Sequence, residues 1–298
     1  MTLTTLPSAQ NTDGLTPAPP ERRRGRGRAA LRRTGLVLAV TVLATVVAWA
    51  LLPSLFAPAD PLLGVGADKL LPPSPDHLFG TDQLGRDLFS RVVHGASLSL
   101  AGAVTAVVTA IVVGSALGLL AGYLGGWVDD AIMRLTDVFL AVPNILMSMA
   151  IITIMGRGAT AVALAVGLAG IGGIARTMRS EVLKVKVADY VEASRAGGAR
   201  WWEIAVHHVL PNARGPIVVL IAIEFGQALL AIAGLSFLGY GEPPPAPEWG
   251  ALVSGGRDYL ATSWWLVTLP GLVIVAVVLS TNHVSRVIQT RYAERSGR

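Results

Sequence analysis

The chain has 298 residues, of which 52% are hydrophobic and only 14% are charged, with a mean hydropathy of +0.58. This composition lies outside the usual range of soluble globular domains and predicts a membrane protein. The absence of cysteine excludes disulfides, thiolate metal sites and cysteine nucleophiles. The net charge of +5 arises from basic residues beside apolar runs, which favours a role in membrane orientation over nucleic-acid binding.

The N-terminal segment, residues 1–32, is rich in Thr, Pro, Ser, Gly and Arg. It has almost no large apolar side chains after Leu15, so it cannot bury enough surface to fold alone. We predict a disordered basic cytoplasmic tail that lies against anionic lipid, with nucleic-acid binding as the weaker alternative.

Apolar runs follow the tail, each near the roughly 20 residues that a hydrocarbon core requires. They cover residues 35–57, 98–122, 131–155, 159–175, 215–239 and 264–285. The first run is too long for the h-region of a cleaved signal peptide, so we interpret it as a retained helix. The sequence therefore predicts an all-α, polytopic membrane protein with six transmembrane helices.

Lysine and arginine set the expected orientation. With the N-terminus in the cytoplasm, 19 of the 24 Lys and Arg residues face inside, and the excess persists without the tail. The outside group is Lys69, Arg86, Arg91, Arg157 and Arg257. We therefore expect both termini, and the polar segment after the fourth span, to be cytoplasmic.

The external segment, residues 58–97, contains most of the string HLFGTDQLGRDLFSRVVHGASLSL, which begins at His77. Gly80 and Gly85 permit tight turns. Asp82 and Asp87 can cap short helices and pair with nearby arginines, Arg86 or Arg91. His77, His94 and Asp82 lack metal-ligand spacing, so we predict no metal site here.

Glycine patterns in the second and fourth spans predict close helix packing. The second span carries a small-xxx-small ridge at Gly114, Gly118 and Gly122. The fourth span matches a dinucleotide fingerprint, G-x-G-x-x-A, but no strand precedes it, so we interpret the match as helix packing. Its residues are Gly170, Gly172 and Ala175.

The third span combines charged residues with a proline. Asp129 and Asp130 lie where a carboxylate complements the start of a helix. Arg134 and Asp137 are three residues apart on the predicted helix and can pair. Pro143 is expected to kink the span.

The fifth span carries Glu224 and Gln227. An ionisable residue inside a membrane segment is costly enough to suggest a function. We expect Glu224 either to line a translocation path or to pair with a polar group of another subunit, with the second interpretation slightly favoured.

The segment after the fifth span is rich in proline between Pro243 and Pro247, which predicts a stiff, extended turn. Trp249 is expected to anchor at the outer membrane interface. Glu248 and Arg257 are expected to be solvated.

A long polar and amphipathic segment lies between the fourth and fifth apolar spans and contains VADYVEASRAGGARWWEIAVHHVLPN, residues 187–212. We predict a helix over 189–196, a turn at Gly197-Gly198, and a second short amphipathic helix that Pro211 ends. Small side chains that allow close approach, together with exposed aromatic side chains, indicate a docking element. Its candidate residues are Tyr190, Glu192, Ala193, Ser194, Ala196, Gly198, Trp201, Trp202, Leu210 and Pro211.

The order Glu192-Ala193-Ser194, Gly198 and Leu210-Pro211 resembles the EAA loop of the permease subunits of bacterial ABC importers. Ser194 stands where that family usually has Ala, and His208 where many members have Ile. The external string resembles the GTDxxGRDxxSR segment of the second permease subunit of dipeptide, oligopeptide and nickel importers, through Gly80, Thr81, Asp82, Gly85, Arg86 and Asp87. The strings DDAIMRLTDVFLAVP and LSFLGYGEPPPAPEWGALVSGGR resemble the same subunits, so the resemblance covers residues 70 to about 282.

This resemblance implies a type I ABC importer permease fold in a bacterial inner membrane. The expected domains are a first helix with its external segment (33–97), a five-helix core (98–286) with a coupling loop at about 181–212, and a cytoplasmic tail (287–298). The implied partners are a second, distinct permease, two ATPase subunits and an external binding protein. The chain has no phosphate loop, so ATP and Mg²⁺ would be bound by the ATPases and the chain would not be an enzyme.

Alternatives remain open for the solute and for the mechanism. Peptides are the favoured solute, with nickel or another small solute as the alternative. An ion-coupled carrier or channel is more remote, because it would need several intramembrane carboxylates. Relatives often carry a Glu at the position of Ile232, so Glu224 departs from the pattern. The candidate path or interface residues are Asp137, Pro143, Glu224 and Gln227.

Overall fold

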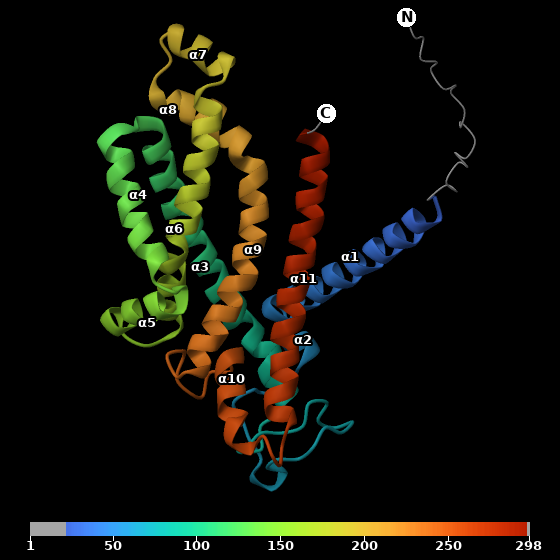
Figure 1. The fold of residues 1–298 in the computed structure, drawn as a ribbon. Helices are drawn as coiled ribbons and strands as arrows, with labels where there is room; N and C mark the ends of the chain where they lie inside the picture. Colours follow the sequence, from blue (N-terminus) through green and yellow to red (C-terminus); the bar gives the residue numbers. More distant parts are fainter. Residues whose placement is uncertain (1–21, 297–298) are drawn as a thin grey trace, which may run out of the picture. The chain divides into compact units, whose positions relative to one another are not determined.

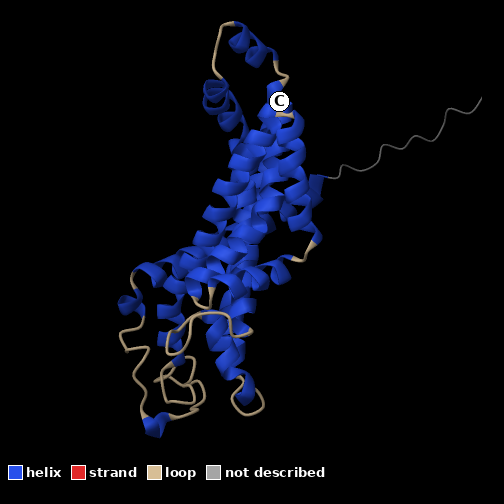
Figure 2. Cartoon of the chain, turned by 90° about the vertical axis from the view of Figure 1, so that its left-hand side faces the viewer, coloured by secondary structure: helices blue, strands red, loops and turns tan. Residues whose placement is uncertain are grey.

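The computed structural model describes residues 22–296, with the side chains of 22–32, 206, 213–216, 218 and 291–296 excepted. The described part is helical, without a named strand (Figures 1 and 2). The chain divides into two units, Met1–Gly35 and Leu36–Arg298. The α-helices are α1 (Arg22–Leu51), α2 (Pro53–Phe56), α3 (Leu88–Leu124), α4 (Gly126–Ala141), α5 (Asn144–Met155), α6 (Ala159–Lys186), α7 (Asp189–Ala196), α8 (Trp201–Ile204), α9 (Leu210–Phe237), α10 (Trp249–Gly256) and α11 (Trp265–Ser296).

Helices α3 and α6 pack most extensively, and the predicted glycine ridge is their contact. A Cβ on Gly114 would lie 2.6 Å from the Cβ of Ile174, and one on Gly118 would lie 2.3 Å from the carbonyl oxygen of Ala175. Gly122 approaches the next turn of α6 in the same way. Because hydrogen atoms alone fill these gaps, the two backbones approach closely.

The fingerprint-like glycines of α6 are packing residues, as expected. A Cβ on Gly172 would lie 3.1 Å from the side chain of Leu140 in α4. The residues lie inside a continuous helix.

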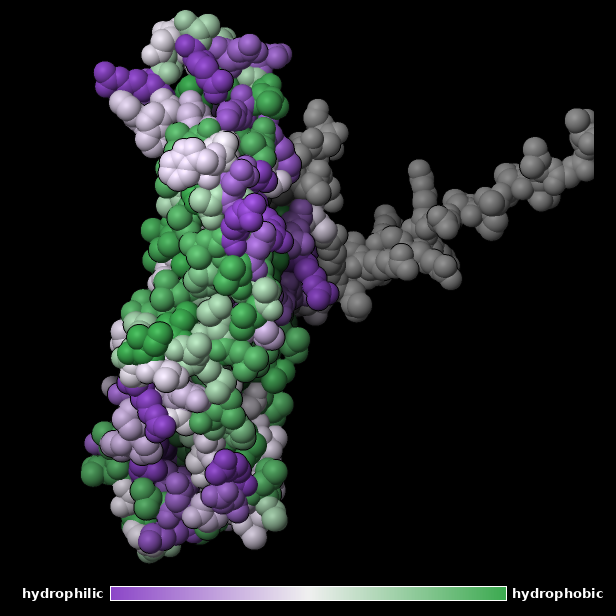
Figure 3. Space-filling view, turned by 60° about the vertical axis from the view of Figure 1, so that its left-hand side comes forward, coloured by the Kyte–Doolittle hydropathy of each residue, from purple (hydrophilic) through white to green (hydrophobic). Residues whose placement is uncertain are grey.

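Five helices of the described chain are long and apolar enough to cross a membrane, and the bent pair α4 and α5 raises the number to six if it forms one crossing. Figure 3 shows hydrophobic side chains over the middle of the visible face, with hydrophilic groups gathered toward both ends. The α7–α8 loop lies at one end of the bundle, and α10 with the segment before α3 lies at the other (Figure 1).

The third predicted span is broken, not merely kinked. Helix α4 ends at Ala141, α5 begins at Asn144, and the two are bent by 100°. Pro143 has no amide hydrogen and disfavours a helical conformation at Val142, which adopts an extended one. The predicted pairing within this span is also wrong, because Asp137 pairs with Arg176 of α6 at 2.5 Å.

The predicted boundaries differ at both ends of the chain. Helix α1 begins at Arg22, so residues 22–32 are helical and not disordered, while residues 1–21 of the predicted tail lie outside the described residues. Alanine, leucine and arginine are good helix formers, and extending an existing helix avoids a new nucleation step. The first span ends at Leu51 because Pro53 follows, and α11 continues to Ser296 through the predicted tail.

Candidate functional site

The polar loop after α6 forms a defined structure with its own small core. Val191 of α7 and Ile204 of α8 are fully buried against Met178 and Val182 of α6. This apolar contact holds α7 and α8 at the end of the bundle, because α7 is too short to be stable alone in water.

Gly198 makes the turn between α7 and α8. Its φ of +85° is left-handed, and a Cβ there would meet no atom within 4 Å. The following turn is fixed by Glu203, whose carboxylate accepts the backbone N–H of Arg200 at 2.8 Å. The conformation of the loop therefore leaves open space beside Gly198.

The predicted docking residues are brought together at this end, and nearly all are exposed. Tyr190, Trp201 and Trp202 expose 45%, 42% and 44% of their surfaces. Trp201 contacts Tyr123 at the end of α3, and the Arg200 guanidinium lies over the Trp202 ring at 4.9 Å. The others are also exposed except Ser194, which is half-buried: Glu192, Ala193, Ala196, Gly198, Leu210 and Pro211. Aromatic surface held this way loses little entropy on binding a partner.

Ser194 and His208, the two departures from the EAA pattern, contact each other. Ser194 Oγ lies 3.1 Å from His208 Nε2, and His208 also packs against the Tyr190 ring. The Asn212 side-chain amide donates to the Tyr190 hydroxyl at 3.2 Å and to the His208 carbonyl oxygen at 2.6 Å. These contacts join α7 to the start of α9.

The predicted end of the second loop helix at Pro211 is wrong. Helix α8 continues through a π-helical turn, Ala205–Val209, directly into α9, and Pro211 stands in the first turn of α9. Proline is tolerated there because its missing N–H removes a hydrogen bond only from the preceding, widened turn. The loop is thus coupled to α9 without an intervening linker.

The GTDxxGRD motif folds the segment before α3 into a compact series of turns. Gly80 and Gly85 both have φ of +74°, and a Cβ on Gly85 would lie 1.9 Å from the carbonyl oxygen of Val65. Thr81 Oγ donates to the Asp68 carbonyl oxygen, while the Thr81 carbonyl oxygen accepts from Trp265 of α11. The predicted tight turns are therefore confirmed.

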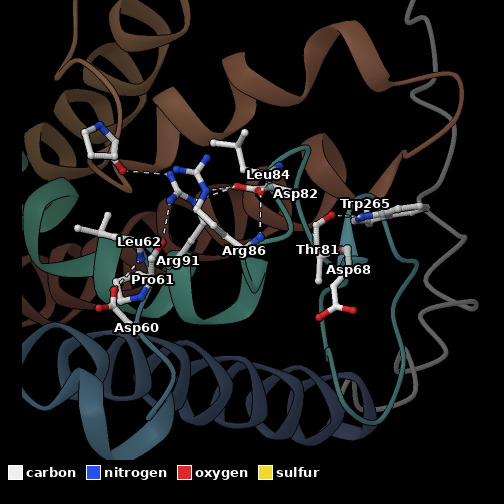
Figure 4. A network of polar contacts seen from close by, with 11 residues as sticks. Asp60, Pro61, Leu62, Asp68, Thr81, Asp82, Leu84, Arg86, Arg91 and Trp265 are labelled. Carbon is white, nitrogen blue, oxygen red and sulfur yellow. Dashed lines mark hydrogen bonds and ion pairs between the residues drawn. The ribbon is translucent and has the colours of Figure 1, made fainter. Parts of the chain in front are cut away.

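The two aspartates of the motif act as predicted. Asp87 caps α3 by accepting the backbone N–H of Ser90 at 2.7 Å, and it also contacts His77. Asp82 accepts Arg86 Nε at 2.6 Å and lies 3.6 Å from Arg91 Nε, as Figure 4 shows. All three members of this charged cluster are buried.

Glu248 and Trp249 were not predicted correctly, because both are buried and not at the surface. Glu248 caps α10 through the backbone N–H groups of Gly250 and Ala251, at 3.0 and 2.9 Å. Burial raises the pKa of the Glu248 carboxyl, and these two hydrogen bonds lower it in part. Trp249 Nε1 donates a hydrogen bond to the Val92 carbonyl oxygen, which joins α10 to α3. Arg257 is exposed as expected and pairs with its neighbour Asp258.

Glu224 and Gln227 line a small cavity of about 50 Å³ between α3, α5, α6 and α9. The structure adds two polar residues that the sequence analysis missed, Asn144 and Ser148 of α5, and leaves Asp137 and Pro143 outside the lining. The signal for Asn144 was its place directly after Pro143 in an apolar run.

The apolar helices and the α7–α8 loop define a class of protein: a polytopic helical permease with a docking loop at one end of its bundle. The chain belongs to the family described as binding-protein-dependent transport system inner membrane component, whose model matches residues 114–297. It is thus a multi-pass inner-membrane permease of an ABC importer, as the motifs predicted.

Several relatives are similar over most of the chain. It is 39% identical over 232 residues to the di/tripeptide transport system permease protein DppC of Pseudomonas aeruginosa, covering 76% of this chain and 77% of that one. It is 43% identical over 210 residues to the glutathione transport system permease protein GsiD of Shigella flexneri, covering 70% and 69%. Among solved structures, the MetNI methionine ABC transporter in an inward-facing conformation has a TM-score of 0.52 at 22% identity, covering 68% of this chain and 97% of that one. This likeness supports the predicted fold.

Proposed function

We propose that this chain forms half of the translocation path of a peptide importer, with a second, distinct permease forming the other half. The observation that carries the proposal is the α7–α8 loop, an ordered aromatic surface at one end of the bundle. A cytoplasmic ATPase would bind this surface, and ATP and Mg²⁺ would be held there and not in this chain, which would do no covalent chemistry. An external binding protein would deliver the solute to the opposite end.

The π-helical turn gives the loop a direct mechanical connection to the path. When the two ATPases close on ATP, they would draw the two coupling loops together. Because α8 runs into α9, this displacement would move the helix that carries Glu224 and Gln227. The path would then change from inward-facing to outward-facing.

Peptides are the proposed solute because similar chains are permeases of dipeptide, di/tripeptide and glutathione transport systems. Nickel or another small solute is the alternative, because the motifs of this chain resemble those of peptide and nickel importers alike. An ion-coupled carrier is less well supported, because Glu224 forms no ion pair with any described residue and is the only carboxylate that lines its cavity.

Uptake by the assembled transporter tests the function. The chain, its partner permease, the ATPases and the binding protein are placed in vesicles, and labelled dipeptide uptake is measured with unlabelled dipeptide, glutathione or Ni²⁺ as competitor. We expect ATP-dependent uptake that dipeptide inhibits and Ni²⁺ does not. ATP-independent uptake driven by an ion gradient would instead support a carrier.

Cysteine labelling tests the proposed orientation without background, since the chain has no native cysteine. Thr262 precedes α11 and Ala196 ends α7, and both are exposed. We expect Thr262→Cys to react with an impermeant maleimide on intact cells, and Ala196→Cys only after lysis. The reverse pattern would overturn the assignment of cytoplasmic termini.

A further inference from the structure

A cavity of about 360 Å³ is lined by α10 and the segment before α3, which lie at the end of the bundle opposite the α7–α8 loop (Figure 1). Its wall comes from the GTDxxGRD motif, the start of α3, the loop of residues 244–246, and helices α10 and α11. This volume is at the lower end of the range for small-molecule pockets, roughly 300 to 1,000 Å³.

The charged groups in the wall of this cavity are not balanced. Asp82, Arg86 and Arg91 line it, and only 4%, 7% and 4% of their surfaces are exposed. No other charged residue belongs to the described lining. Two guanidinium groups therefore share one carboxylate, which leaves an excess positive charge in a buried setting, where an unpaired charge is costly.

Asp82 holds Arg86 more closely than it holds Arg91. Its Oδ1 accepts the backbone N–H groups of Leu84 and Arg86, at 2.8 and 3.0 Å. Its Oδ2 accepts Arg86 Nε at 2.6 Å. Arg91 Nε, at 3.6 Å from the same oxygen, is buried and makes no hydrogen bond (Figure 4). The Asp82 carboxylate therefore binds Arg86 directly and offsets the charge of Arg91 only at longer range.

Arg86 supplies further donors. Of its three side-chain nitrogens, only Nε donates to a described residue, so the two terminal nitrogens have no acceptor among the described residues. The two terminal nitrogens of Arg91, by contrast, donate hydrogen bonds to the carbonyl oxygens of Pro61 and Pro245, at 2.8 and 3.3 Å. The rest of the wall is mainly apolar, including Leu88, Leu252 and Leu266. The arrangement suits a small molecule with one carboxylate and an apolar body, since a guanidinium fork matches a carboxylate.

We propose that this cavity binds the carboxyl terminus of the peptide as it leaves the binding protein. Arg86 would hold the carboxylate, with Arg91 adding charge behind it, and the apolar wall would accept the last side chain. This inference rests on the proposed peptide function and adds to it a position at the entrance and a requirement for a free carboxylate.

The direct test uses the purified full chain in nanodiscs, with alanyl-leucine and its C-terminal amide as probes. Saturation-transfer NMR detects weak binding and yields relative affinities. We expect the acid to bind at least tenfold more tightly than the amide, because the amide lacks the charge that the guanidinium groups pair with. Equal binding of the two peptides would overturn the proposal.

Two glycine variants test the location without removing any charge. A Cβ on Gly255, in the cavity wall, or on Gly271, outside it, would meet no atom within 4 Å. Gly255→Leu should fill the cavity and abolish binding of the acid, while Gly271→Leu should bind it normally. Normal binding of the acid by Gly255→Leu would overturn the location.

An arginine variant tests the charge. Arg86→Gln, checked for folding by size-exclusion chromatography, should lower the affinity for the acid at least tenfold.

The outcomes also separate this proposal from the proposed function. If the assembled transporter imports peptides while this chain binds neither probe, the cavity proposal fails and the importer assignment stands. If, in addition, Gly255→Leu prevents docking of the binding protein, the carboxylate belongs to an acidic side chain of that protein and not to the solute.

Discussion

The motif residues at the two ends of the bundle differ in how far they are buried. At the end with the GTDxxGRD motif, Asp82, Glu248 and Trp249 are buried and contact other parts of the same chain. At the α7–α8 end, Trp201 and Trp202 are large and exposed. Both ends carry close family resemblance, so resemblance alone does not distinguish residues that hold the fold from residues that meet a partner.

The contacts within the chain separate two kinds of motif residue. A motif residue whose polar atoms are satisfied within the chain serves first to shape the segment, as Asp87 does by capping α3. Gly198, by contrast, makes a left-handed turn and leaves open space beside the loop.

The largest expected effect compares two left-handed glycines. A Cβ on Gly85 would meet the Val65 carbonyl oxygen at 1.9 Å, whereas one on Gly198 would meet nothing within 4 Å. Gly85→Ala should cost at least about 3 kcal/mol, from backbone strain and overpacking together. Gly198→Ala should cost only about 1 kcal/mol, from strain alone. Thermal unfolding in detergent measures both, and equal losses would contradict the contrast.

A second substitution at Gly198 tests the partner surface and not the fold. Gly198→Arg places a long charged side chain in the space beside the loop, outside the buried cluster of Val191 and Ile204. Loss of a central contact typically costs about 2 kcal/mol or more, roughly thirtyfold in affinity. We expect normal insertion, little ATPase recovered on pull-down, and no uptake. Full recovery of active ATPase would rule out this loop as the coupling element.

A third, smaller effect concerns Glu248 and is dependent on pH. Burial raises the pKa of its carboxyl in the folded protein above the ordinary 4.5, so the folded state binds the proton more tightly than the unfolded state does. Stability from this group should therefore rise as pH falls from above the raised pKa toward 4.5. Glu248→Gln should remove that dependence while costing about 1 kcal/mol for a weakened cap. Melting temperatures at several pH values test this, and an unchanged slope in the variant would contradict it.

The spans and short motifs were predictable because they depend on local sequence. Hydropathy located the apolar runs, the glycine spacing located the contact of α3 with α6, and Gly197-Gly198 located the end of α7. Each signal lies within one stretch of chain and follows from helix geometry or backbone freedom.

The errors concern contacts between distant residues. Asp137 was assigned to Arg134, three residues away, but pairs with Arg176. Trp249 was placed at the membrane interface by residue type, but its indole N–H meets the Val92 carbonyl oxygen, and Ser99 Oγ accepts its backbone N–H. Nothing local to Pro211 indicates that a π-helical turn would carry α8 into α9. Such contacts follow from packing, which no single segment encodes.

The smallest expected effect is at Glu192, a motif residue whose side chain is exposed on α7. It lies in the first turn, where a carboxylate complements the helix dipole by about 0.3 to 1 kcal/mol. Glu192→Ala keeps the helix, because alanine is the best helix former and Val191 still holds α7 in its cluster. We expect ATPase binding within about threefold of the unmodified chain, since one exposed charge contributes little. A loss as large as that of Gly198→Arg would mean that Glu192 pairs with a buried cation of the ATPase, and the salt dependence of the pull-down would then reveal that ion pair.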